Sequence, residues 1–314
     1  MKSKLRIIIS MLLLSLSVKA QQVVFAPQWT AQAQFAGYYA ALENGYYKEL
    51  GLDVCIQHPT VSYSSIDMLK DCKADIITCE LIQAMMTSDA EVELVNILQT
   101  TQHSTLVLIS RAENVRQLAD VAGCRVGSWK VGFSEIPHMI DEEQNLDIEW
   151  IKLMNPLNPY IAGAIDATLA KTYNELIAFS MSGITPGSVL YFSEHGYDFP
   201  EDGLYVTEDY YKKHKEQCRL FAEASRKGWD WVRNNPDKAL DIIMKYVKKE
   251  NVTTNKYNQK WMLEALLQAQ EDIKGELPTY RLNEDAFNQL NEALKKYGYI
   301  SKSIVYEKFI GEQL

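Results

Sequence analysis

The chain has few of the residues from which metal and redox sites are built, and those it has are scattered. No pair among its five cysteines shows the Cys-x-x-Cys spacing of a zinc or redox site, and the odd number leaves at least one cysteine unpaired. We therefore expect no metal, no cofactor and no disulfide framework. The residues concerned are Cys55, Cys72, Cys79, Cys124 and Cys218, with the dispersed histidines His58, His103, His138, His195 and His214.

The sequence motifs of several common enzyme classes are also missing. The chain contains no Gly-x-Ser-x-Gly, no Walker loop, no His-Glu-x-x-His and no glycine pattern for a dinucleotide. Hydrolase, nucleotide-using and zinc-protease mechanisms therefore have no support in the sequence. We predict that the protein is not an enzyme.

An excess of positive charge is absent as well. The formal net charge is -9, and the first twenty residues hold four basic and no acidic residues, so the remainder carries -9 minus 4, or -13. An acidic chain of this kind repels nucleic acid and anionic lipid, and neither is expected as a partner. Net charge does not select a small ligand in a shielded pocket, which depends on the lining residues.

Long apolar runs are confined to the N-terminus. Lys2, Lys4 and Arg6 precede an apolar run from Ile7 to Leu16, and small residues lead to a cleavage position near Ala20. This is the pattern of a secretory signal peptide, and the run is shorter than the roughly 20 residues that span a bilayer. No cysteine lies beside the cleavage position to accept a lipid. We predict a free periplasmic protein.

The rest of the chain, about 290 residues, is larger than one core usually is and predicts two domains. Short apolar runs alternate with stretches of helical periodicity, which predicts parallel βαβ units. Strands are expected at 23–26, 53–56, 74–78, 92–98, 105–109, 148–153, 166–170 and 189–192. Residues 203–207 are expected to form the return crossing between lobes, and the chain from 208 onward is expected to be helical.

The segment from Trp29 to Val54 combines an aromatic-rich turn, a helix and a second strand. It resembles the opening of the type II periplasmic solute-binding proteins, in the branch of thiamine pyrimidine-precursor, riboflavin and sulfonate binders within the pyrimidine synthase-like superfamily. Residues 115–129 and 166–175 are similar to that family's second lobe. The resemblance implies an α/β fold of two lobes, each a mostly parallel sheet flanked by helices, with a hinged ligand cleft.

We place the signal peptide at 1–20, lobe I at 21–103 and 205–314, and lobe II at 104–204, with the chain crossing between lobes twice. The resemblance further implies a monomer that captures a small molecule and delivers it to an ABC transporter permease in the inner membrane. A receptor-sensor role would differ only in the membrane protein on which the closed lobes dock.

In open α/β sheets, ligands collect beyond the carboxyl ends of the strands, where helix N-termini offer unpaired N–H groups. Tyr38 is added to the residues at these places because it lies about one helical turn from Gln34, whereas Tyr39 would face the core. The Gly127-Ser128 turn is expected to form a backbone cradle. The predicted ligand-binding residues are Gln28, Trp29, Gln34, Tyr38, Tyr63, Ser64, Glu80, Ser128, Trp129, Tyr173, Asn174 and Glu175.

Each of these residues has an ordinary structural role as an alternative. Trp29 and Trp129 could pack within or between the lobes, Glu80 and Glu175 could be surface carboxylates, and Ser64 could serve only as a helix cap.

Aromatic rings beside amides and carboxylates suit a planar heteroaromatic ligand, with Glu175 as the favoured acceptor for its amino groups. A sulfonate would call for arginine, and none follows these strands. We therefore predict a thiamine pyrimidine precursor first and riboflavin second. The alternatives are a binder of sulfonate or taurine, and an iron-dependent enzyme similar to the pyrimidine synthase, whose cysteine-rich motif this chain lacks.

Overall fold

The computed structural model describes residues 22–90, 92–129, 133–155, 157–271 and 275–312. The predicted signal peptide at 1–20 lies outside these ranges. In the described part of the chain, no helix is long and apolar enough to cross a membrane.

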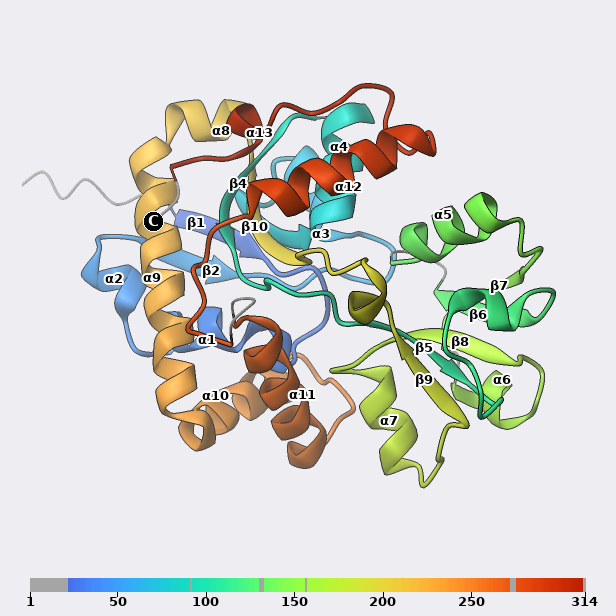
Figure 1. The fold of residues 1–314 in the computed structure, drawn as a ribbon. Coiled ribbons are helices and arrows are strands. Elements are labelled where there is room, and N and C mark those ends of the chain that lie inside the picture. The colour runs from blue at the N-terminus through green and yellow to red at the C-terminus, as the bar shows by residue number, and fades with distance from the viewer. Residues whose placement is uncertain (1–21, 91, 130–132, 156, 272–274, 313–314) are drawn as a thin grey trace, which may run out of the picture.

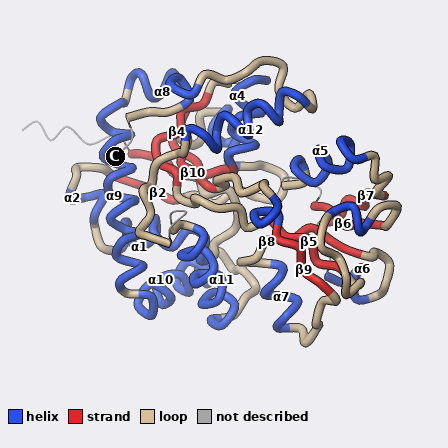
Figure 2. The backbone as a smooth tube through the Cα atoms, in the orientation of Figure 1, coloured by secondary structure: helices blue, strands red, loops and turns tan. Residues whose placement is uncertain are grey.

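Two five-stranded sheets form the centres of two lobes (Figures 1 and 2). The sheet of lobe I has the strand order β2-β1-β3-β10-β4, and that of lobe II has the order β7-β6-β8-β5-β9. The strands of lobe I are β1 (Gln22–Ala26), β2 (Asp53–Ile56), β3 (Ile76–Glu80), β4 (Leu94–Gln99) and β10 (Asp202–Thr207). Those of lobe II are β5 (Leu106–Ser110), β6 (Arg125–Trp129), β7 (Glu149–Leu153), β8 (Ala167–Lys171) and β9 (Ser188–Tyr191).

Both sheets are mixed, and so the expectation of mostly parallel sheets needs a correction. In lobe I, β1 pairs in parallel with β2 and β3, whereas β10 runs antiparallel to β3 and β4. In lobe II, β6 pairs in parallel with β7 and β8, whereas β5 runs antiparallel to β8 and β9. The antiparallel pairs in both sheets have one origin, because each involves β5 or β10, the strands by which the chain enters one lobe from the other.

The chain crosses between the sheets twice, from β4 to β5 and from β9 back to β10. The predicted second boundary, between residues 204 and 205, would cut β10 in two. Because β10 belongs wholly to the sheet of lobe I, that boundary lies before Asp202.

Helices cover both faces of each sheet (Figure 1). Those that follow the strands of lobe I are α1 (Ala36–Glu43), α2 (Tyr46–Glu49), α3 (Ser65–Lys70) and α4 (Leu81–Ala90). Lobe II carries α5 (Glu135–Gln144), α6 (Leu157–Ile161) and α7 (Glu175–Met181). The C-terminal helices return to lobe I as α8 (Glu208–Lys213), α9 (Lys215–Asn234), α10 (Pro236–Lys249), α11 (Lys256–Ala269), α12 (Glu284–Lys296) and α13 (Tyr306–Phe309).

Alternate residues of the strands enter different cores, as the pleat of a sheet requires. Phe25 packs in a cluster with α1, α9 and α10, whereas its neighbour Ala26 faces a cluster with α3, α4 and α12. In lobe II, Val107 packs with α6 and α7, and Leu108 joins the second cluster, which also includes residues of α5. This second cluster therefore runs through both lobes.

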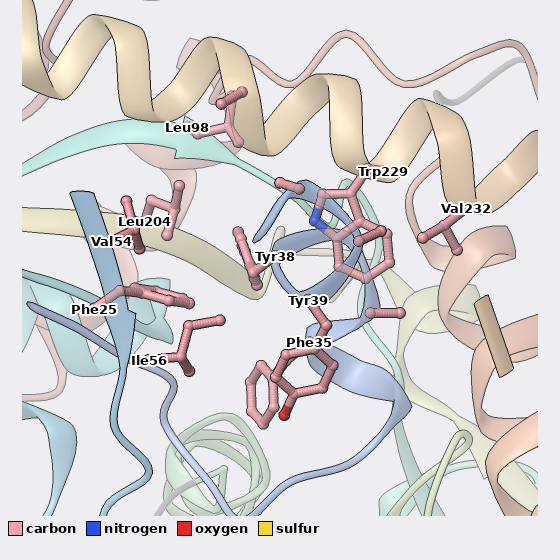
Figure 3. Packing of buried hydrophobic residues seen from close by; sticks show 14 of the residues in the cluster. Phe25, Phe35, Tyr38, Tyr39, Val54, Ile56, Leu98, Leu204, Trp229 and Val232 are labelled. Carbon is pink, nitrogen blue, oxygen red and sulfur yellow. The ribbon is translucent and has the colours of Figure 1, made fainter. Parts of the chain in front are cut away.

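The packing of α1 against α9 depends on two glycines. A Cβ on Gly228 would overlap the carbonyl oxygen of Gly37, and a Cβ on Gly37 would overlap the indole of Trp229. Tyr38, on the same helix as Gly37, is buried with its ring edge-on to Trp229 (Figure 3). The backbones of α1 and α9 thus lie so close together that no side chain fits between them at Gly37 and Gly228.

Helix caps follow from local sequence. Ser64 caps α3 in a capping box with Asp67, which is the structural role given above as its alternative. Asn283 caps α12, and Gly298 takes a left-handed conformation just beyond the end of that helix. Gly127 and Ser128, in contrast, form no turn. Both lie inside β6, which continues to Trp129 because parallel pairing with β7 extends that far.

Candidate ligand-binding cleft

A cavity of about 160 Å³ lies between the two lobes. Its lining residues come from both, with neutral amides and hydroxyls, aromatic rings, two carboxylates and one ammonium group. From lobe I they are Gln28, Trp29, Gln32, Gln34, Ser64, Ser65, Ile66, Glu80 and Gln83. From lobe II they are Trp129, Phe133, Lys171, Tyr173, Asn174 and Glu175.

The cavity lies at the carboxyl ends of the strands, as the general rule for α/β sheets predicts. Gln28 follows β1, and Glu80 is the last residue of β3. In lobe II, Trp129 and Lys171 are the last residues of β6 and β8. The ends of the two sheets therefore face each other across the cleft.

Nine of the twelve predicted residues line this cavity, and three do not. Tyr38 is 1% exposed and packs between Phe25 and Trp229 in the core of lobe I (Figure 3). The prediction that Tyr38 contacts the ligand is therefore wrong, because α9 covers the face of α1 that carries this side chain.

The other two predicted residues that do not line the cavity are Tyr63 and Ser128. The Tyr63 hydroxyl donates to the carboxylate of Asp71, at 2.9 Å, which directs the ring along α3. Ser128 is 1% exposed within β6. It does not border the cavity, whereas its strand neighbour Trp129 does.

Lys171 is the cation of the cleft, and the sequence prediction missed it. Its Nζ lies 3.0 Å from a carboxylate oxygen of Glu80 and 2.9 Å from one of Glu201. Burial raises the pKa of Glu80 to about 7, although the charge of Lys171 acts in the opposite direction. The two neighbouring carboxylates raise the pKa of Lys171 despite its burial. Its charge is therefore already balanced by groups of the protein.

Glu175 is 8% exposed, which excludes the alternative of a surface carboxylate. One of its oxygens accepts a hydrogen bond from the backbone N–H of Lys171, at 2.7 Å, and the other accepts one from the amide of Asn174, at 2.9 Å. Burial raises the pKa of Glu175. The carboxylate thus closes the turn from β8 into α7 and also borders the cavity.

Aromatic side chains stand on both sides of the cavity. Trp29 is 43% exposed, which excludes a core position for it. Trp129 and Phe133 lie with their ring centroids 6.1 Å apart, and the Nζ of Lys171 lies 5.0 Å from the centroid of Phe133. A planar ligand would find apolar rings in both lobes.

Six lining residues are not among the twelve that were predicted, namely Gln32, Ser65, Ile66, Gln83, Phe133 and Lys171. Lys171 directly follows the strand predicted at 166–170, so the rule of strand ends covers its position although it was not selected. Gln32 shares the loop after β1 with Gln34, and its amide donates to the Gln34 side chain at 2.6 Å.

The two crossing segments are joined by hydrogen bonds behind the cavity. His103, which lies near the predicted hinge, has its Nδ1 2.6 Å from a carboxylate oxygen of Asp198. The backbone N–H of Ser104 donates to the other oxygen of Asp198, at 2.8 Å. Glu201 accepts from the backbone N–H of Thr105, also at 2.8 Å. Any change in the angle between the lobes must bend this linked pair of segments.

Among the residues that the structure describes, no three His, Cys, Asp or Glu side chains are grouped so as to hold a metal ion. All five cysteines are free, with Cys79 and Cys218 buried and Cys72 exposed.

The chain is similar in sequence to known binding proteins. A family described as NMT1/THI5 like matches residues 32–239, more than half of the chain. The formylaminopyrimidine-binding protein of Halalkalibacterium halodurans is 24% identical over 289 residues, which cover 89% of this chain and 86% of that protein.

Solved structures show the same fold. The aliphatic sulphonate binding protein SsuA from Escherichia coli superposes with a TM-score of 0.66 and 13% identity, covering 93% of this chain and 98% of that one. The desulfurization enzyme DszB superposes with a TM-score of 0.60 and 13% identity, covering 92% and 96%. The periplasmic-binding-protein fold predicted from the sequence is confirmed, and it is a fold that binding proteins share with an enzyme.

Proposed function

Because the chain belongs to the NMT1/THI5-like family of periplasmic binding proteins, we propose that it is the extracytoplasmic substrate-binding component of an ABC importer. Its cargo is a small heteroaromatic solute, with a pyrimidine precursor of thiamine as the first candidate. The relative named for formylaminopyrimidine binding supports this choice. None of the relatives described above is named for riboflavin.

One observation carries the choice of ligand class. The cleft offers rings from both lobes, but its ammonium group is held between the carboxylates of Glu80 and Glu201. No arginine is among the described residues that line the cavity. A sulfonate would thus meet more negative than free positive charge, whereas an amino heterocycle would meet acceptors.

Capture then requires the ligand to contact both lobes. A ligand can shift the lobes toward a closed arrangement only to the extent that it binds that arrangement better. The lining residues from the ends of β1, β3, β6 and β8 would supply such contacts on opposite walls. The closed protein would deliver its cargo to a permease in the inner membrane.

The test begins with a native mass spectrum of the mature protein purified from the periplasm, which reports any molecule carried along. Titration calorimetry then compares an aminopyrimidine, riboflavin and an alkanesulfonate. We expect binding of the aminopyrimidine with a Kd of about 1 μM or tighter, near -8 kcal/mol, and no binding of the sulfonate. Binding of the sulfonate alone would overturn the proposed ligand class, and binding of none would overturn the solute-capture role.

A further inference from the structure

His58, in the segment after β2, is hydrogen-bonded to the backbone of the loop that carries Trp29 to the cleft. Its Nδ1 lies 2.7 Å from the carbonyl oxygen of Trp29. Because a carbonyl oxygen only accepts hydrogen bonds, Nδ1 must carry a proton and donate it. Burial lowers the pKa of His58 from its usual 6.5, so the ring is neutral at pH 8. In a neutral ring with a proton on Nδ1, the other nitrogen, Nε2, is an acceptor.

Tyr39 stands on the other side of the imidazole and supplies the matching donor. Its hydroxyl lies 2.9 Å from Nε2 of His58. Tyr39 is fully buried in the core of lobe I (Figure 3), and its ring stacks on that of Tyr246 from α10, with the centroids 4.0 Å apart. Burial raises the pKa of Tyr39, although a hydrogen bond from the backbone of Gln32 acts in the opposite direction. Tyr39 and His58 therefore hold the loop after β1 at both Gln32 and Trp29.

This loop supplies part of the lobe I wall of the cavity. Trp29 and Gln32 both line the cavity, whereas His58 and Tyr39 are not among the described residues that line it. The Trp29 side chain is 43% exposed, so its own packing does little to fix the ring. Any effect of His58 on a ligand must therefore act through the loop.

We propose that His58 is a positioning residue for ligand capture: supported by Tyr39, it fixes the backbone of Trp29 so that the indole is in place before the ligand arrives. A side chain that is ordered in advance does not have to be ordered by the ligand, and this raises affinity. The inference rests on the proposed function and adds a residue, outside the cavity, on which the wall of the cleft depends.

A double-mutant cycle tests whether His58 acts through Trp29. Titration calorimetry measures the affinity of 4-amino-2-methylpyrimidine for the wild type, His58→Leu, Trp29→Ala and the double variant. The loss of one hydrogen bond in His58→Leu should weaken binding about fivefold. In the Trp29→Ala background the same change should have no further effect, because the indole that His58 positions is already gone. An equal loss in both backgrounds, or no loss in His58→Leu alone, overturns the inference.

Two further variants separate positioning from a general loss of structure. His58→Asn places an amide nitrogen close to the position of Nδ1, so it should keep the hydrogen bond to Trp29 and bind within about twofold of wild type. Binding as weak as that of His58→Leu would overturn the inference. If His58→Leu does not fold, His58→Gln replaces it in the cycle, because its amide falls near Nε2 instead.

His195→Leu is the matched control. Its Nδ1 also lies close to a backbone carbonyl oxygen, 2.9 Å from that of Tyr191, and neither residue is among the described residues that line the cavity. This variant should bind as the wild type does. A loss as large as that of His58→Leu would show that the effect is not specific to the loop after β1, and would overturn the inference.

A measurement without ligand keeps the two proposals apart. Nitrogen NMR of the wild-type protein at pH 8 reports which ring nitrogen of each histidine carries the proton. We expect His58 to carry it on Nδ1, and a proton on Nε2 would overturn the inference whether or not a ligand binds. If His58 has the expected tautomer and the protein binds no aminopyrimidine, the proposed function is contradicted while the contact between His58 and Trp29 stands.

Discussion

Lys171 of lobe II and Glu80 of lobe I form an ion pair across the cleft, with Nζ 3.0 Å from the carboxylate oxygen and the two side chains 4% and 11% exposed. Each is the last residue of its strand, so the pair joins the carboxyl ends of the two sheets. Glu201, in the return crossing, completes the arrangement on the other side of the ammonium group.

We expect Lys171→Met to lower the free energy of unfolding by about 3 kcal/mol or more, because it leaves Glu80 and Glu201 buried without a counter-charge. Chemical denaturation measures the change. Lys256→Met removes an exposed pair with Asp241 and should change the free energy of unfolding much less, because solvent and salt screen an exposed pair. Similar losses in the two variants would show that the buried pair contributes no more than a surface pair.

We expect Trp29→Ala or Glu175→Ala to weaken ligand binding by about 1 kcal/mol or more, roughly fivefold to tenfold, since one removes a stacking ring and the other an acceptor. Trp261 is the matched control for Trp29, because it is 46% exposed on α11 and does not line the cavity. Calorimetric affinities equal to wild type in both cleft variants would show that the ligand binds elsewhere.

The raised pKa of Glu80 predicts a pH dependence. The folded state holds the proton of Glu80 more tightly than the unfolded chain, in which the pKa of this group is near 4.5. The stability that the protonated Glu80 contributes is fully present below pH 4.5 and is lost as the pH rises through the folded pKa of about 7. The unfolding free energy of Glu80→Gln relative to wild type should therefore increase between pH 5 and pH 8.

A control for this slope is Glu143→Gln. The hydrogen bond from Lys296 lowers the pKa of Glu143, so its contribution is present at high pH and lost on acidification. Because the pKa of Glu143 lies below 4.5 in the folded protein, the difference in unfolding free energy between this variant and wild type should stay nearly flat between pH 5 and pH 8. If the difference in unfolding free energy between Glu80→Gln and wild type does not change with pH, the pKa of Glu80 is not raised in the folded protein.

We expect Gly228→Ala to destabilise the fold by about 1–3 kcal/mol, because the added methyl group has no room against the backbone of α1. Arg226→Ala, on the exposed side of the same helix, should change stability by less than about 0.5 kcal/mol. Thermal denaturation compares the two. Equal melting temperatures would mean that α9 shifts away from α1 at little cost.

The sequence predicted the fold and most positions of the cleft because both follow from local patterns. The ends of apolar strands can be read directly, and they located Gln28, Glu80 and Trp129. Lys171 comes directly after the predicted strand at 166–170, so the rule of strand ends covers its position, but the sequence does not show that its side chain lies in the cleft. The surroundings that decide its charge come from Glu80 and Glu201, which are distant in sequence.

Tyr38 was predicted in the cleft and lies in the core, for a reason that local patterns cannot supply. Helical periodicity separates Tyr38 from Tyr39 by about 100° but does not say which side the rest of the chain will cover. That side is set by α9, which begins almost 180 residues later in the sequence. Asp202 is similar, because nothing near it in sequence indicates that it will accept hydrogen bonds from Gln28 and Gln34, more than 160 residues away.

The position of β10 also sets the order in which the lobes can form during synthesis. All strands of the lobe II sheet lie between residues 106 and 191, so that sheet is complete before β10 has been made. The lobe I sheet is not, because β10 fills the place between β3 and β4. Until the ribosome has added residues 202–207, β3 and β4 each expose an unpaired edge, the kind of surface that pairs with other chains. The half of the protein that is translated first is therefore the half whose sheet is completed last.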